Sequence, residues 1–273
     1  MILTLLYSAS QKMLSAALLL YVGFAGAFTD HSENTKNNNP TTVTAKAATP
    51  SSLKGIDVSK WQKDVDWMQV KGADITFAFV KATQADYRLD PYFSRNWDET
   101  KRVGIKRGAY HFYIPGAPVQ GQIEIFKNTV KLEAGDLPPV LDIEVMDSKV
   151  SGEQMRQDIK AWLEAITQHY GVKPIIYTNQ NYYRRWLQGY FQDYHFWIAR
   201  YSPAEPDIHH TDKWMFWQYT DRGAIPGINA HVDMNFFAGD WDTLHAMCLP
   251  DVSTLASSEA MILDELRNLQ PIK

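Results

Sequence analysis

The amino-acid sequence predicts an α/β fold, a single irregular (β/α) barrel of the TIM type in which some crossover helices are missing. Two observations lead to this prediction. Eight short apolar segments, rich in β-branched and aromatic residues, alternate with segments of helical periodicity. Several connections, such as residues 202–213, are too short and too rich in proline and histidine to form a full helix. At 273 residues the chain is long enough for one such domain.

The eight apolar segments are the expected strands of the barrel. Most of them are almost continuously apolar, as in parallel strands that are buried on both faces. In chain order they are Gly55–Ser59, Ile75–Thr83, Arg107–Tyr113, Pro139–Val145, Pro174–Thr178, Phe196–Tyr201, Trp214–Thr220 and His231–Phe236.

The clearest helical pattern covers Gly152–Tyr170. Ser151 and Gln154 form a capping-box pair at its start. Gly171 stands where a left-handed residue commonly ends a helix. Two further helical patterns, each followed closely by a glycine, cover Pro91–Val103 and Val119–Glu133.

The N-terminal segment does not fit the barrel pattern. Residues 1–27 contain an apolar stretch that ends in the small residues Ala-Gly-Ala, which is typical of a secretory signal peptide. An uncleaved signal anchor is the alternative. Residues 28–52 are rich in Asn, Thr, Ser, Ala and Pro, and we expect them to form a disordered linker.

These boundaries place the barrel at residues 53–248, followed by a C-terminal helical extension over residues 249–273. The extension contains an amphipathic pattern at residues 257–269, which favours a helix packed on the outside of the barrel. We expect an exported protein, periplasmic or secreted, with a membrane tether through the N-terminal segment as the alternative.

The composition narrows the class of partner. A net charge of −4 argues against a nucleic-acid-binding protein, which usually needs a basic face. The single cysteine, Cys248, excludes an internal disulfide and a cysteine-based zinc cluster. The sequence contains no other metal or dinucleotide motif, so we expect no cofactor and no metal. We also expect a monomer.

Four acidic residues in the expected strands are candidates for catalysis. Asp142 and Glu144 are two positions apart, so in a strand they share a face, about 6.6 Å apart. Two carboxylates so close repel each other, which raises the pKa of one of them, as glycosidic cleavage requires. Asp57 and Asp233 lie in the first and last strands, which are neighbours in a closed barrel. Each acid taken alone has a structural alternative. Asp142 and Glu144 could lie at a solvated strand end or in an ion pair, Asp57 could cap a turn, and Asp233 could form an ion pair.

The same cleft is expected to carry aromatic and hydrogen-bonding side chains for a sugar. Such residues alternate in several of the expected strands, although packing in the core explains half of them equally well. The expected substrate-binding residues are Tyr110, His111, Tyr177, Trp197, Trp217 and Gln218.

Short motifs run in a fixed order from Gly55 to about Gly239: GIDVS at 55–59, DW at 66–67, VKAT at 80–83, GAYHF at 108–112, LPPVLDIE at 137–144, PIIY at 174–177, WIA at 197–199, FWQY at 216–219 and VDMN at 232–235. In this order they resemble the family 25 glycoside hydrolases, lysozymes that act as N-acetylmuramidases. The resemblance implies a distorted β/α barrel. It also implies hydrolysis of the β-1,4 bond between N-acetylmuramic acid and N-acetylglucosamine in peptidoglycan glycan strands.

The resemblance also assigns roles to the four acids. Glu144 stands at the position of the general acid of the family. Asp142 stands at the position that orients or stabilises the 2-acetamido group or the oxocarbenium-like centre. Asp57 and Asp233 take the two remaining acidic positions of the cleft.

The sequence departs from the family pattern at four positions. Gln84 and Ala85 stand where the family usually has Glu and Gly, and Lys63 stands where it usually has Gly. Arg88 stands near a position where an aromatic residue or Leu is common. These departures concern contacts to the substrate more than catalysis. Two other functions remain open at this point: a catalytically inactive wall-sugar-binding protein on the same barrel, and a chitinase-like glycosidase. The latter usually has a longer run of acids than Asp142 and Glu144.

Overall fold

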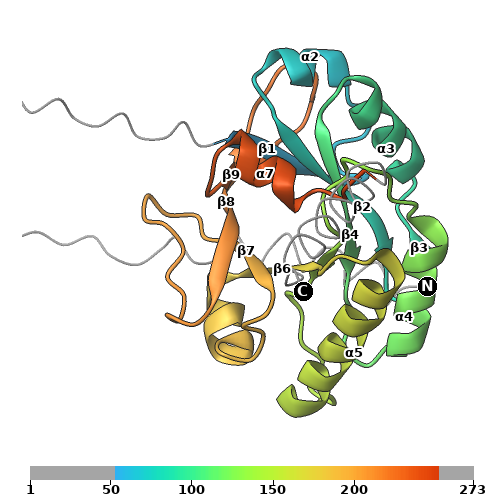
Figure 1. Ribbon diagram of the computed structural model, residues 1–273, viewed down its shortest axis with the longest axis vertical. Helices are drawn as coiled ribbons and strands as arrows, with labels where there is room; N and C mark the ends of the chain where they lie inside the picture. The colour runs from blue at the N-terminus through green and yellow to red at the C-terminus, as the bar shows by residue number, and fades with distance from the viewer. Residues whose placement is uncertain (1–52, 252–273) are drawn as a thin grey trace, which may run out of the picture. The chain divides into compact units, whose positions relative to one another are not determined.

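The computed structural model describes residues 53–251 (Figure 1). The expected signal peptide, the linker and nearly all of the C-terminal extension lie outside these residues. Within residues 53–251, none of the helices combines the length and the apolar character that crossing a membrane requires.

Eight strands form a closed barrel, as the sequence predicted. The barrel closes because the first strand pairs with both the second and the last one. The order around the barrel is β1 (Leu53–Val58), β2 (Phe77–Gln84), β4 (Lys106–Phe112), β5 (Val140–Asp142), β6 (Ile175–Asn179), β7 (His195–Ala199), β8 (Lys213–Gly223) and β9 (Val232–Phe237). A short ninth strand, β3 (Arg88–Leu89), forms a hairpin with β2 beside the barrel.

The direction of the last strand corrects the expectation of an all-parallel barrel. Strand β9 runs antiparallel to both β8 and β1, whereas the other barrel strands pair in parallel. Only residues 224–231 separate β8 from β9. A parallel connection needs a crossover of about a dozen residues or more, so this short link forces a hairpin.

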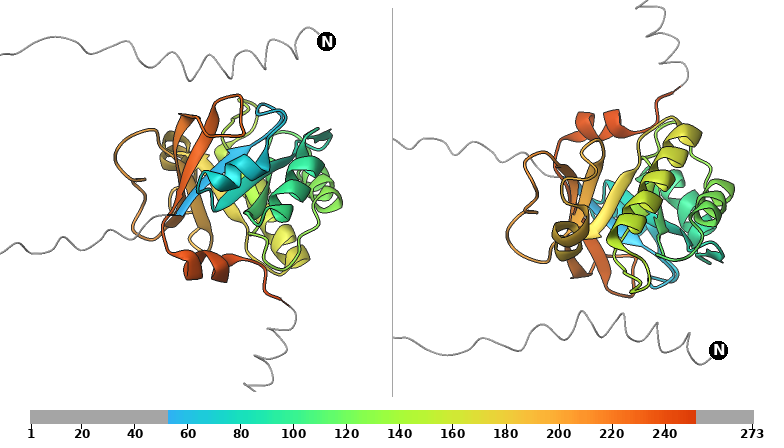
Figure 2. Two further views of the ribbon diagram at one scale, coloured as in Figure 1. Left: turned by 90° about the horizontal axis from the view of Figure 1, so that it is seen from above. Right: turned by 90° about the horizontal axis from the view of Figure 1, so that it is seen from below.

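Helices cover the barrel unevenly (Figures 1 and 2). Helices α3 (Phe93–Arg102), α4 (Val119–Thr129) and α5 (Gly152–Tyr170) lie along one side, and strands β8 and β9 form the opposite side. Helix α5 has the predicted bounds, with Ser151 as its N-cap and Gly171 in the left-handed conformation at its end. No helix joins β7 to β8, as expected for residues 202–213.

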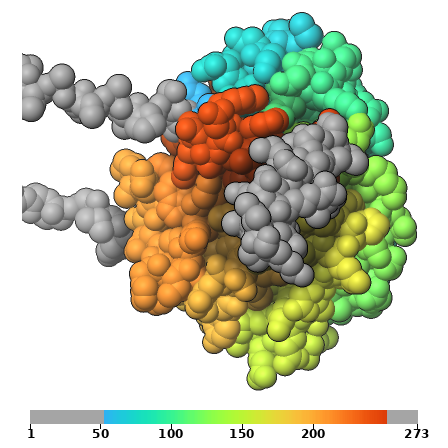
Figure 3. Space-filling view, in the orientation of Figure 1, coloured from blue at the N-terminus to red at the C-terminus, as the bar shows by residue number. Residues whose placement is uncertain are grey.

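Sequence reasoning missed the short elements α2 (Trp67–Gly72), α6 (Gln180–Tyr182), the π-helix η1 (Tyr183–Leu187) and α7 (Trp241–Met247). Asp66 and Asp240 cap the starts of α2 and α7 by accepting backbone N–H groups, a signal that the sequence contained. Helix α7 closes one end of the barrel, because Leu244 packs into the barrel interior. Figure 3 shows α7 on the surface at that end.

The hydrophobic core has two layers, one inside the barrel and one between the strands and the helices. Aromatic rings fill the interior: the Phe79 ring stacks on Trp197 at 4.5 Å and meets Phe216 edge-on at 5.1 Å. Phe216 also contacts Phe77 and Phe237. Below, the end where the parallel strands begin is called the base, and the end where they finish is called the mouth.

Candidate active site

Three of the four candidate acids lie in strands that meet at the mouth. Asp57 is the penultimate residue of β1, and Asp142 is the last residue of β5. Asp233 is the second residue of β9, directly opposite Asp57 in the antiparallel pair. Because β9 is reversed, its first residues lie at the mouth; in a parallel barrel Asp233 would have been at the base.

Asp57 and Asp233 form a hydrogen-bonded pair of carboxyl groups. Burial and the nearby charge of Asp57 raise the pKa of Asp233 to about 9, and the carboxyl groups of the two residues are hydrogen-bonded. Burial likewise raises the pKa of Asp57 to about 6. Near neutral pH, Asp233 therefore carries the proton and donates it to the carboxylate of Asp57.

Glu144 does not lie in a strand, which corrects the geometry expected for the second pair. Strand β5 ends at Asp142, so the ideal strand spacing does not apply to Glu144. The two carboxyl groups nevertheless interact, because the charge of Glu144 raises the pKa of Asp142. Burial is the larger cause for both groups: it raises the pKa of Asp142 well above its ordinary value and the pKa of Glu144 to about 6.

Asp142 also has an unused hydrogen-bond acceptor. Its Oδ1 atom is buried and accepts no hydrogen bond from the described residues. A buried polar atom without a partner is costly in a folded protein and is typical of a site that a ligand completes. The half-buried carboxyl group of Glu144 lies two residues further along the chain.

One cation lies near these acids. The ammonium group of Lys81, in β2, interacts with Asp142, Asp90 and Glu144, although burial lowers the pKa of Lys81. Its Nζ atom also donates a hydrogen bond to Gln84 Oε1 at 3.0 Å. Lys81 was not among the predicted site residues; a lysine inside an otherwise apolar strand was the signal available for it.

Amide side chains hold Asp57 in place. Gln218 Nε2 and Asn235 Nδ2 each donate to Asp57 Oδ2 at 2.9 Å. The hydroxyl groups of Tyr177 and Tyr201 donate to Gln218 Oε1 at 3.0 and 2.7 Å. The network therefore brings Tyr177 and Gln218 to Asp57, and it adds Asn235 and Tyr201, which sequence reasoning missed.

Tyr110 also lies among the acids, whereas its neighbour His111 does not. The hydroxyl of Tyr110 faces Asp57 and Asp142, whose charges, together with burial, raise its pKa. The ring of His111 is fully buried on the outer side of β4, where it bonds to Thr83 and Gln122 and stacks on Trp162 of α5. The prediction that His111 binds substrate is wrong, because adjacent residues of a strand point to opposite faces.

Two tryptophans also depart from the predicted role. Trp217 alternates with Gln218, and its ring contacts Tyr219 and Phe236 on the outer face of the sheet. Trp197 is only 2 % exposed inside the barrel, where its indole N–H donates to Asn235 at 2.7 Å. Trp197 therefore supports the network around Asp57 and offers no free face to a sugar.

The arrangement is that of an acid–base hydrolase. It combines one carboxyl group with a pKa near neutrality, a second buried carboxyl group beside it, and a second pair of carboxyl groups that are hydrogen-bonded to each other. Within residues 53–251, no group of three or more His, Cys, Asp or Glu side chains is placed to hold a metal ion. Fold and site together define a carboxylate-dependent hydrolase on a closed α/β barrel.

Comparisons with known proteins give the family. The model of "Glycosyl hydrolases family 25" matches residues 56–228, and the chain belongs to this family. It is 41 % identical over 199 residues to the protein YegX of Escherichia coli K12, covering 71 % of this chain and 72 % of that protein. It is 33 % identical over 226 residues to Lysozyme M1 of Streptomyces globisporus, covering 76 % and 75 %.

A solved structure agrees with the sequence relatives. The bacterial lysozyme from Streptomyces coelicolor superposes with a TM-score of 0.69 at 32 % identity, covering 72 % of this chain and 97 % of that one. The resemblance stated from the sequence motifs is thus confirmed, and the protein is a glycoside hydrolase with the lysozyme fold of this family.

Proposed function

We propose that the protein is an N-acetylmuramidase, which hydrolyses the β-1,4 bond between N-acetylmuramic acid and N-acetylglucosamine in peptidoglycan. The observation that carries the proposal is the pair at the end of β5. Glu144 has a pKa of about 6, and the neighbouring Asp142 has a buried oxygen without a partner.

Glu144 is the general acid in this proposal. A carboxyl group with a pKa near 6 holds its proton in part of the molecules near neutral pH and still releases it readily. The proton passes to the glycosidic oxygen as the bond to the anomeric carbon breaks, so the leaving sugar departs as a neutral alcohol.

Asp142 orients the sugar that becomes positively charged. The N–H of a 2-acetamido group is the hydrogen-bond donor that Asp142 Oδ1 lacks. A donor to the carboxylate favours its ionised form, so binding of the sugar lowers the pKa of Asp142. The remaining proton of the pair then resides on Glu144, and the charge of Asp142 stabilises the oxocarbenium-like transition state.

Asp57 and Asp233 complete the site from the opposite side of the mouth. The carboxylate of Asp57 is fixed by Gln218 and Asn235, and Asp233 contributes a shared proton. Held in this way, the pair presents one negative charge and a set of hydrogen bonds of fixed orientation to the substrate.

Analysis of the cleavage products tests the proposal. Purified peptidoglycan is digested with the protein, the new reducing ends are reduced with borohydride, and the fragments are analysed by mass spectrometry. We expect reduced muramic acid at the new ends. Reduced glucosamine at these ends, or an absence of fragments with folded protein, would contradict the proposal.

We further propose that the protein is exported and acts as a monomer on the cell wall. The apolar stretch within residues 1–27 and its Ala-Gly-Ala end support a cleaved signal peptide, which would leave Phe28 as the first residue. N-terminal sequencing of the exported protein tests this: a chain that still begins at Met1 would indicate a membrane anchor instead.

A further inference from the structure

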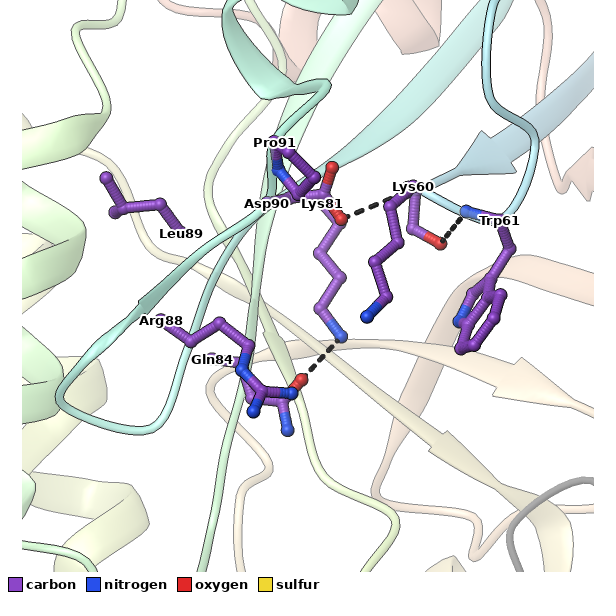
Figure 4. A pocket seen from close by; sticks show the side chains of 9 residues that line it. Lys60, Trp61, Lys81, Gln84, Arg88, Leu89, Asp90 and Pro91 are labelled. Atoms are coloured by element: carbon purple, nitrogen blue, oxygen red, sulfur yellow. Dashed lines mark hydrogen bonds between the residues drawn. The ribbon is translucent and has the colours of Figure 1, made fainter. Parts of the chain in front are cut away.

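A pocket of about 310 Å³ lies beside the acids at the mouth (Figure 4). Three parts of the chain form it: the loop that follows β1, the end of β2, and the β3 hairpin with the residues after it. Lys81 belongs both to the pocket and to the surroundings of Asp142 and Glu144, so the pocket adjoins the site of cleavage. Its lining residues are Ser59, Lys60, Trp61, Lys81, Gln84, Arg88, Leu89, Asp90 and Pro91.

The lining carries more positive than negative charge. Lys60, Lys81 and Arg88 contribute cations, and Figure 4 shows the two ammonium groups and the guanidinium pointing into the same space. Asp90 is the one acidic residue of the lining. Both oxygens of its carboxylate already accept backbone N–H groups, from Lys60 and Tyr92, at 3.0 Å each.

Two of the three cations of the pocket, Lys60 and Arg88, form no ion pair with a carboxylate of the described residues. Among residues 53–251, neither Lys60 nor Arg88 has a carboxylate within 4.0 Å, and each lies near an aromatic ring instead. Lys81 donates to the amide of Gln84, and its charge is attracted by Asp142, Asp90 and Glu144. All three side chains are half-buried. Two partly desolvated cations, Lys60 and Arg88, that face one space without an ion-pair partner favour an anionic ligand there.

We propose that this pocket binds a carboxylate group carried by the glycan strand, and that it thereby selects acidic glycans over neutral ones. The inference rests on the proposed function. Two parts of peptidoglycan offer the same chemistry: the lactyl carboxylate of a muramic acid without peptide, and the free carboxylates of a peptide stem. The guanidinium of Arg88 supplies the planar donor pair that suits a carboxylate, and Lys60 supplies a second charge.

Trp61 gives the pocket a sugar-sized wall. Its indole is 51 % exposed at the edge of the pocket, and the ammonium of Lys60 lies 4.8 Å from the ring centroid. An exposed indole offers a flat apolar face on which the less polar side of a pyranose ring can pack. A muramic acid packed there would direct its substituent toward the cations.

Binding measured without cleavage tests the inference. The Glu144→Gln protein is titrated calorimetrically with four ligands. Two are a peptide-free tetrasaccharide of alternating N-acetylglucosamine and N-acetylmuramic acid and the same tetrasaccharide with its carboxylates converted to methyl amides. The other two are a tetrasaccharide with peptide stems whose carboxylates are free and the same compound with these carboxylates amidated. We expect carboxylate forms to bind about 10-fold more tightly than their amidated forms at low salt, and the difference to shrink as salt is added.

Charge-matched variants locate the effect. Arg88→Gln and Lys60→Gln, made in the Glu144→Gln protein, should remove most of the preference for carboxylates. Arg102→Gln on α3 and Lys160→Gln on α5, which remove the same charges at exposed sites away from the pocket, should retain it. Circular dichroism confirms that each variant is folded.

Each outcome bears on the proposal. A preference confined to the peptide-free ligand assigns the pocket to the lactyl carboxylate, and one confined to the stem-bearing ligand assigns it to the peptide. Equal binding of carboxylate and amide forms, retention of the preference in both pocket variants, or no binding of any ligand would overturn the proposal. The proposed function is judged separately, by whether the wild-type protein cleaves the same tetrasaccharides.

Discussion

The two ends of the barrel bury charged groups in opposite ways. At the base, Arg107 is 2 % exposed, and its guanidinium donates to both oxygens of Asp136 at 2.7 and 3.1 Å. It also donates to the carbonyl of Trp97 at 2.7 Å and stacks on the ring of that residue at 3.9 Å. At the mouth, the carboxyl groups of Asp57, Asp142, Glu144 and Asp233 lie close enough to act on one another, and the ammonium of Lys81 interacts with Asp142 and Glu144.

The difference separates charges that serve stability from charges that serve chemistry. At the base each nitrogen of the Arg107 guanidinium donates to an acceptor, so removing its partner would leave a buried charge uncompensated. At the mouth the acids raise one another's pKa, and Asp142 Oδ1 has no partner. The cluster of carboxyl groups at the mouth therefore destabilises the folded protein. Removal of one of these charges should affect turnover more than stability.

The largest effect is expected for Glu144→Gln. Loss of the general acid should lower turnover by about 100- to 10,000-fold on soluble peptidoglycan fragments. The thermal midpoint should not fall, since a carboxyl group crowded by other acids does not stabilise the fold. Glu164→Gln on the exposed face of α5 serves as the control and should leave turnover unchanged. Near-normal turnover of Glu144→Gln would remove this residue from the proposed role.

At the base, Asp136→Asn should act on stability instead. It leaves the buried guanidinium of Arg107 without its main counter-charge, which should lower the free energy of unfolding by about 3 kcal/mol. Urea unfolding measures the loss. Asp193→Asn, which alters an exposed ion pair, should produce a far smaller change. If both variants lost the same free energy of unfolding, the buried ion pair at the base would contribute no more to stability than an exposed one.

Asp142→Asn should change the pH dependence of catalysis. In the substrate complex the ionised Asp142 raises the pKa of Glu144, so its removal lets Glu144 ionise at lower pH. The basic limb of the kcat profile should move to lower pH by about one unit, and turnover should fall. An unmoved limb would show that the two carboxyl groups are not coupled during the reaction.

Asp233→Asn should stabilise the protein at neutral and alkaline pH. The pKa of Asp233 is about 9 in the folded protein and is close to 4 in an unfolded chain, so between these values the folded state binds the additional proton. Stability from this group therefore decreases as pH rises from about 4 to 9. Between about pH 4 and about pH 8, the free energy of unfolding should therefore fall less in the variant than in the wild type. The difference between the two losses should be at least about 1 kcal/mol. Parallel stability curves would contradict the shared proton.

The smallest effect is expected for Lys63→Gly in the loop after β1. Lys63 has a φ of 55°, in the left-handed region that favours glycine, and Ala85 has a φ of 50°. These are the two positions at which the motif resemblance leads one to expect glycine. Lys63→Gly should stabilise the protein by up to about 1 kcal/mol in thermal unfolding. Lys160→Gly, within α5, should destabilise it by about the same amount.

Much of the fold could be predicted from the sequence because the barrel strands are nearly continuous apolar segments with clear boundaries. The closed barrel, the bounds of α5 and the missing helix before β8 all followed from this pattern. The reversal of β9 did not follow from this pattern, because an apolar segment looks the same whether the strand runs parallel or antiparallel. Only the short link between β8 and β9 indicates the antiparallel direction.

The site was predicted less completely, for two physical reasons. Adjacent residues were assigned to one cleft, although strand alternation places His111 and Trp217 on the outer face. Hydrogen bonds across the barrel could not be predicted either: Asn235 donates to Asp57 from a strand far along the chain, and Tyr201, which follows β7, reaches Asp57 only through Gln218. The cationic pocket likewise depends on the β3 hairpin, whose two-residue strand is too short to produce a pattern.

The reversed strand β9 also determines where the catalytic domain can be coupled to a surface, a label or a second protein. Leu53 pairs with Phe237 at the base, and Leu249 bonds to the backbone of Asp136 at the same end. Both ends of the described chain thus leave the barrel opposite the mouth. For protein engineering, this is a favourable geometry. A surface, a label or a second enzyme coupled ahead of Leu53 or after Asp251 would join the catalytic domain at its base. An immobilised lysozyme built in this way would keep its mouth open to insoluble cell walls.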